Sequence, residues 1–164
     1  MAVAKKAGRI RPAQVKKVLS SYAERGVFRS FSQVASEDGT SEFRFHWLWN
    51  LPFHVAFDAA KATLSFRKLL PGIPRGSRLE SELKEFIDSF YDGTRIEHRA
   101  ADRSRLSMRC SNRRGTITLS FKIVGSDADY GVRKAVNIVS EIFLDFLNAR
   151  FPDYTAAKFK LPEE

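Results

Sequence analysis

The sequence predicts an α+β fold in which helices pack on one face of a five-stranded antiparallel sheet. Five segments alternate apolar and polar residues, the pattern of strands with one buried and one solvated face. Three other segments place apolar residues at helical spacing. The expected element order is α-β-β-β-α-β-β-α, and a chain of 164 residues with 43% hydrophobic residues has the size of one domain.

The N-terminal part is expected to hold a basic arm and the first helix. Residues 1–11 lack periodicity and are interpreted as a flexible arm. The first helix begins at Pro12, a residue favoured in the first turn, and ends at Gly26. Its apolar side is formed by Val15, Val18, Leu19 and Tyr22. Phe28 and Phe31 then lie in an irregular or short extended stretch, before a polar loop at residues 36–41.

The first three strands follow in residues 43–66. Their inward apolar residues are Phe43, Phe45 and Trp47 in the first, Phe53, Val55 and Phe57 in the second, and Leu64 and Phe66 in the third. The first two strands share the same parity, so an odd-length connection at residues 49–51 predicts a hairpin. The predicted cross-strand pairs are Phe43 with Phe57, Phe45 with Val55, and Trp47 with Phe53. The third strand has the opposite parity, which requires an even-length connection at residues 58–63.

The second half of the chain adds two helices and two strands. Ser77 followed by Glu80 has the spacing of a capping box, and the stripe Leu79, Leu83, Phe86, Ile87 and Phe90 follows it. The fourth and fifth strands have the inward residues Leu106, Met108, Cys110, Ile117, Leu119, Phe121 and Ile123, with a tight turn at residues 112–115. The last helix starts at residues 127–130 and stops before Pro152.

These elements form a single α+β domain over residues 12–150. Residues 151–164 are interpreted as a C-terminal tail, with Phe151, Tyr154, Phe159 and Leu161 as its candidate docking residues. The element order resembles the fold of class I type III secretion chaperones and the YbjN-like bacterial proteins. The resemblance lies in the order and lengths of the elements over residues 12–147. It implies a small, cytoplasmic, non-enzymatic homodimer that binds another protein.

Composition favours an anionic partner as well. The net charge is +9, and the Lys and Arg residues concentrate in residues 1–30 and 95–122. Secretion chaperones are usually acidic, so an effector-chaperone role in the narrow sense is not expected. Residues 1–10 lack the apolar core of a signal peptide and no stretch approaches a membrane span, so we expect a cytoplasmic protein without a membrane partner. The single cysteine, Cys110, cannot form an internal disulfide.

Two candidate binding surfaces emerge from the alternation. The polar side of the sheet is expected to bind polyanions, with nucleic acid as the candidate partner. Its residues are Arg44, His46, His54, Arg67, Arg105, Arg109, Arg113, Arg114 and Lys122. A protein-binding surface is expected near the first hairpin, where one sheet face cannot bury every apolar residue. Its residues are Trp47, Leu48, Trp49, Leu51 and Phe53.

No enzyme chemistry is expected from the motifs. The sequence has no glycine-rich phosphate loop, no Gly-x-Gly-x-x-Gly, no His-Glu-x-x-His and no Cys-x-x-Cys, so no cofactor is expected. His46 and His54 would face each other across the first hairpin, but only Asp58 lies nearby, so no metal site is expected. The first hypothesis is a non-enzymatic chaperone-like or adaptor-like module that binds protein. The alternative is a polyanion-binding module that uses the basic sheet face and the N-terminal arm.

Overall fold

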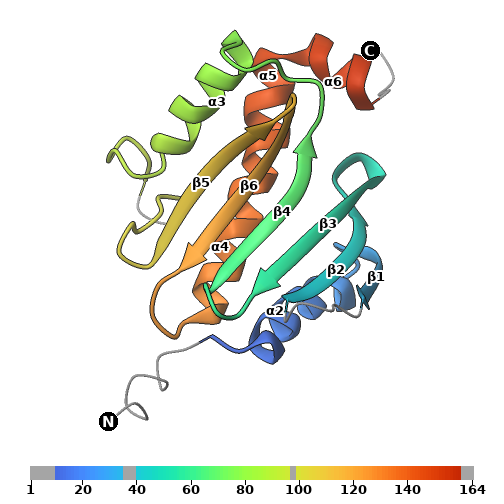
Figure 1. Ribbon diagram of the computed structural model, residues 1–164, viewed down its shortest axis with the longest axis vertical. Helices are drawn as coiled ribbons and strands as arrows, with labels where there is room; N and C mark the ends of the chain where they lie inside the picture. Colours follow the sequence, from blue (N-terminus) through green and yellow to red (C-terminus); the bar gives the residue numbers. More distant parts are fainter. Residues whose placement is uncertain (1–9, 35–39, 97–98, 160–164) are drawn as a thin grey trace.

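The sheet of this protein has one face covered by helices and one face open (Figure 1). The computed structural model describes residues 10–34, 40–96 and 99–159. Most of the expected basic arm, part of the polar loop at 36–41, and Leu161 of the tail therefore lie outside the described residues. Ile10, which the arm was expected to include, is buried in the core.

Six antiparallel strands form the sheet in the order β1-β2-β3-β4-β6-β5. The strands are β1 Arg29–Val34, β2 Thr40–Trp47, β3 Leu51–Asp58, β4 Thr63–Leu70, β5 Leu106–Arg113 and β6 Thr116–Ile123. The α+β class is confirmed, but the prediction of five strands was wrong. The missed strand is β1. Its register with β2 shifts between Arg29 and Ser32, where Ser30 adopts a left-handed conformation with φ 55°. This irregularity and the single aromatic Phe31 remove the alternation that identifies a half-buried strand.

The helices are α2 Pro12–Glu24, α3 Arg78–Asp88, α4 Ala128–Glu141 and α6 Pro152–Phe159. The last predicted helix is observed as α4, a π-helical continuation at Ile142–Leu147, and the short α5 Asn148–Arg150. In Figure 1, α4 runs along the back of the sheet behind β6 and β4. Gly131 permits this close approach, because a Cβ there would lie 2.7 Å from Ile123 Cγ1 of β6. Part of the expected tail forms α6, where Tyr154 Oη donates to the Pro71 carbonyl oxygen at 2.6 Å.

The covered face holds an aromatic core. Its fully buried side chains include Phe28, Phe43, Phe45, Phe57, Phe66, Phe90, Phe121, Phe143 and Phe146. Phe28, which precedes β1, stacks on Phe45 of β2 with ring centroids 4.0 Å apart. All inward positions predicted for β2, β3, β4 and β6 are buried. Met108 and Cys110 of the edge strand β5 are only half-buried, because β5 has a neighbour on one side alone.

The register of the first hairpin differs from the prediction by two residues. Phe43 pairs with Val55, Phe45 with Phe53, and Trp47 with Leu51. The connection is a 3₁₀ turn at Leu48–Asn50 rather than at residues 49–51. Trp49 and Asn50 both adopt a left-handed conformation there, with φ of 55° and 59°. Parity was predicted correctly, but alternation alone does not distinguish registers that differ by two residues.

The start of α3 is capped at Ser77, as predicted, but the reciprocal half of the capping box is absent. Ser77 Oγ accepts from the Glu80 amide at 3.4 Å. The Glu80 carboxylate instead accepts from the Gly76 amide at 2.9 Å and from Asn112 Nδ2 at 2.8 Å. These two bonds lower the pKa of Glu80 below its ordinary value. Glu80 therefore ties α3 to the β5–β6 hairpin.

Phe143 supplies a test of the aromatic core. It is 1% exposed, whereas the adjacent Leu144 is 45% exposed. Phe143→Ala should lower the free energy of unfolding by about 3 to 5 kcal/mol, the usual range for a buried aromatic residue. Leu144→Ala should change it by less than about 1 kcal/mol. Urea denaturation of both variants checks this, and equal losses would show that the helix does not face the sheet as described.

Glu80 supplies a test of pH dependence. Because its pKa is lowered in the folded protein, its stabilising contribution is present above the ordinary glutamate pKa of about 4.3 and is lost as the pH falls through the folded-state value. Glu80→Gln should therefore destabilise the protein near neutral pH, and the difference from wild type should shrink below about pH 4.3. Thermal melting of both proteins from pH 7 to pH 3 measures this. The exposed Glu85→Gln is the matched control and should show no such trend.

Candidate functional site

The open face of the sheet carries cations and hydroxyl groups in adjacent cross-strand rows. In one row, Arg44 of β2 lies opposite His54 of β3, which lies opposite Arg67 of β4. In the next row, Ser65 of β4 lies opposite Ser120 of β6, and Ser120 lies opposite Arg109 of β5. The rows exist because the same alternation that directs aromatic residues inward directs these residues outward.

Several predicted polyanion-binding residues are brought together on this face. Arg44, Arg109 and Lys122 are exposed and form no ion pair with any described residue. Arg113 and Arg114 are exposed at the β5–β6 turn. The turn was predicted correctly, and both Arg114 and Gly115 adopt positive φ there, at 52° and 85°.

Arg105 does not lie on the open face. It immediately precedes β5, and its guanidinium group turns toward the start of α4. There it contacts Asp127 Oδ2 at 2.8 Å and lies 3.6 Å from the ring centroid of Tyr130. The prediction that Arg105 lies on the polar face was wrong because Arg105 lies beyond the end of the strand. Alternation does not fix the direction of a side chain there.

Glu42 is a residue of the candidate site that sequence reasoning missed. Its Oε1 lies 2.5 Å from His54 Nε2 and 3.3 Å from an Arg67 guanidinium nitrogen. Glu42 shares the even parity of Arg44 in β2, so the alternation contained the signal. The carboxylate partly neutralises the centre of the face. It also gives His54 a partner other than His46, which instead lies opposite Arg29 and Pro52.

Hydroxyl groups fill the space between the cations. Ser65 Oγ and Ser120 Oγ are 2.9 Å apart, joined by a hydrogen bond between β4 and β6. Thr118 Oγ1 accepts from the Lys68 amide at 3.1 Å. Hydroxyl groups beside Arg and Lys are typical of surfaces that contact phosphate oxygens. The open side of β2–β6 carries no aromatic residue, because these strands direct their aromatic side chains to the covered face.

The residues expected to bind protein are mostly covered. Trp47 and Phe53 are 7% and 5% exposed. Phe28 packs edge-on against Trp47 at 5.2 Å between ring centroids. Trp49 packs against Phe143 at 5.6 Å and also contacts α6. Leu48 and Leu51 are half-buried against the same core.

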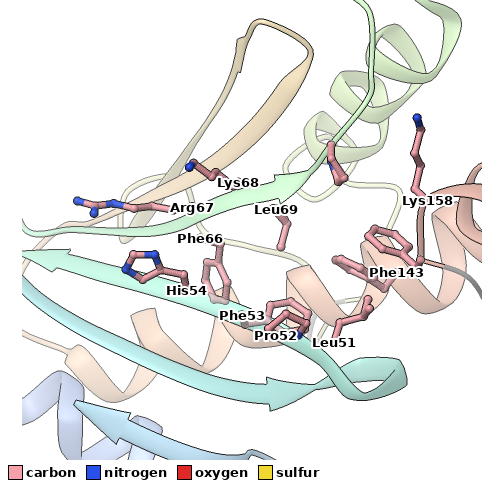
Figure 2. A pocket seen from close by; sticks show the side chains of 12 residues that line it. Leu51, Pro52, Phe53, His54, Phe66, Arg67, Lys68, Leu69, Phe143 and Lys158 are labelled. Carbon is pink, nitrogen blue, oxygen red and sulfur yellow. The ribbon is translucent and has the colours of Figure 1, made fainter. Parts of the chain in front are cut away.

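A pocket of about 290 Å³ opens where β3 and β4 diverge (Figure 2). Its walls come from β3, β4, the segment after β4, the π-helical segment and α6. The lining residues are Leu51, Pro52, Phe53, His54, Phe66, Arg67, Lys68, Leu69, Pro71, Phe143, Lys158 and Phe159. The pocket therefore has an apolar interior with cationic side chains around it, and sequence reasoning did not identify it.

The described residues offer little for nucleophilic or metal chemistry. Cys110 is half-buried, and burial raises the pKa of its thiol, the reverse of what an activated nucleophile needs. No group of three or more His, Cys, Asp or Glu side chains in the described part of the chain is placed to hold a metal ion. None of the described helices is long and apolar enough to cross a membrane.

Comparisons with known proteins identified no relative of this chain. A scan against protein-family models, a search of curated protein sequences and a search of solved structures each found no match to the chain.

Proposed function

We propose that this protein is a non-enzymatic binding module whose open sheet face binds the phosphate backbone of nucleic acid. The observation that carries the proposal is the set of exposed cations on this face, Arg44, Arg109 and Lys122, which lack a carboxylate partner among the described residues. Such cations gain binding free energy when they displace the counterions condensed on a nucleic acid.

The dimensions of the face suit several phosphates at once. Arg44 of β2 and Arg109 of β5 are separated by β3, β4 and β6. With strands spaced about 4.8 Å apart, the two cations lie roughly 19 Å apart across the sheet. A duplex strand rises about 3.4 Å per nucleotide along its axis, so this span corresponds to roughly five to six nucleotide steps. Ser65 and Ser120 lie between the two cations and add hydroxyl donors.

The same face lacks the groups on which single-stranded bases stack. Such stacking requires exposed aromatic rings, and the open side of β2–β6 has none. The proposed ligand is therefore the phosphate backbone of a duplex. The chaperone-like or adaptor-like hypothesis remains a second proposal, with the half-buried Leu48, Trp49 and Leu51 as its accessible residues, since Trp47 and Phe53 are buried.

Neutralising the face tests the proposal. The double variant Arg44→Gln, Arg109→Gln should weaken binding to every duplex sequence tested and should reduce the slope of log K against log [salt] by about one unit per lost phosphate contact. Fluorescence anisotropy of labelled duplexes, measured at several salt concentrations, gives both quantities. Melting should be nearly unchanged, because the side chains are exposed.

The matched control removes two exposed lysines from α2, as Lys16→Gln, Lys17→Gln. Both double variants lower the net charge equally, so only a specific role of the open face separates them. Equal losses of affinity would mean that net charge alone drives binding. Absence of salt-dependent binding by the wild-type protein would overturn the proposal.

Glu42 gives a prediction of the opposite sign. Glu42→Gln removes the negative charge beside His54 and Arg67, so the affinity for duplex should rise by about two- to fivefold at low salt, the range of a screened surface charge. Anisotropy at low and high salt measures the change, which should fade as the salt concentration rises. Glu24→Gln, an exposed carboxylate on α2, is the control. A loss of affinity in Glu42→Gln would contradict the proposed role of the face.

A further inference from the structure

We propose that the pocket between β3 and β4 binds a small monocarboxylate with an unbranched apolar chain of roughly eight carbons, and that Lys158 pairs with its carboxylate. This site borders the open face at His54 and Arg67, but it does not use the contacts of Arg44, Arg109 and Lys122, and it stands or falls without them. The inference rests on four observations: the divergence of the strands, the apolar interior, the volume, and an ammonium group at one end that has no ion-pair partner among the described residues.

The pocket exists because β3 and β4 separate before either strand ends. Their ladder stops at His54 and Arg67. Beyond this pair, β3 continues to Leu51 along β2, whereas β4 continues to Leu70 along β6. Lys68 has a φ of 50°, and the register with β6 shifts between Phe66 and Leu70. This bulge turns β4 away from β3, and Figure 1 shows the two strands parting toward the end of the sheet near α6.

The interior of the pocket is apolar and about the size of a short acyl chain. Phe53 and Phe66 line it from the two strands, and Phe143 lines it from the π-helical segment. Figure 2 shows these rings around the opening between the strands. At about 30 Å³ per water-sized group, 290 Å³ holds roughly ten non-hydrogen atoms. Octanoate has this size, and each methylene that it buries tightens binding about fourfold.

Lys158 and Lys68 are the two lining cations that form no ion pair with a described residue, and Lys158 is the one that lies at the α6 end of the pocket. His54 and Arg67, at one end of the pocket, already pair with Glu42. Lys158 projects from α6 near Phe143, at the other end in Figure 2, and has no ion-pair partner among the described residues. Its side chain crosses Gly72, where a Cβ would lie 2.5 Å from Lys158 Nζ. Gly72 thus leaves the space in which the Lys158 ammonium group lies, next to Pro71 of the pocket wall.

This combination selects an amphiphile over the alternatives. A phosphate backbone could pair with Lys158 but would leave the apolar wall beside Leu51 and Phe159 unfilled. A neutral apolar molecule would fill the walls but would gain nothing from the ammonium group. A carboxylate with an apolar chain satisfies both, because ammonium–carboxylate bonds are charge-assisted and the chain leaves water.

Calorimetric titration of the full chain with octanoate, 1-octanol and butanoate tests the chemistry without any variant. Octanoate should bind saturably and at least about tenfold more tightly than 1-octanol. Butanoate, which is four methylenes shorter, should bind roughly 200-fold more weakly than octanoate, because each methylene contributes about fourfold. Trp49 emission should change on octanoate binding, since Trp49 touches Phe143 and Phe159 of the pocket wall. Absence of saturable octanoate binding, or equal affinity for 1-octanol, would overturn the proposal.

Lys158→Met tests the position of the carboxylate. It keeps an unbranched side chain beside Gly72 and removes the charge, so octanoate affinity should fall about five- to tenfold while 1-octanol affinity stays unchanged. Lys61→Met, an exposed lysine in the β3–β4 turn at the opposite end of the same strands, is the matched control and should bind octanoate like wild type. Equal octanoate affinity in the two variants would refute the role of Lys158. Duplex binding measured in parallel separates this outcome from failure of the nucleic-acid proposal.

Discussion

One-sided burial of the sheet is the constraint on which the rest of the structure depends. Phe45, Phe53 and Phe121 all project toward the helices, and each is almost fully buried. Because side chains alternate along a strand, a slip of one residue in any of these strands would exchange the two faces. The contact of Gly131 with Ile123 brings α4 close enough to seal the aromatic side. The opposite face then has no packing role and is free to carry the charges that the proposed function uses.

Alternation and helical spacing made most of the fold predictable from sequence. Pro12, Ser77 and the β5–β6 turn lie where their residue types indicated. The predictions were wrong where the local sequence carries no pattern that indicates the structure. The strand β1 has a bulge at Ser30 in place of clean alternation. The register of the first hairpin depends on Trp49, whose backbone adopts a left-handed conformation. Tryptophan is not a residue type that indicates a turn.

The candidate site was less predictable, because it depends on strand order and on strand ends. Parity placed Arg44 and Arg109 on one face, yet only the observed order of strands brings them within reach of the same ligand. Glu42 has the outward parity of the cations on the open face, but its charge is opposite to theirs. The pocket could not be foreseen, because the divergence of β3 and β4 requires positive φ at Lys68, whose type gives no hint of it. Lys158 joins the pocket through α6, a helix that the sequence indicated only as a tail.

The central claim is that the uncovered face is the binding surface for a polyanion. Titration of isotopically labelled protein with a short duplex at low salt, followed by amide chemical shifts, tests it most directly. The account predicts that the largest shifts fall on the strands around Arg44, Ser65 and Arg109, with α2 and α4 nearly unchanged. Shifts concentrated on α2 or α4, with the open face unaffected, would contradict the account.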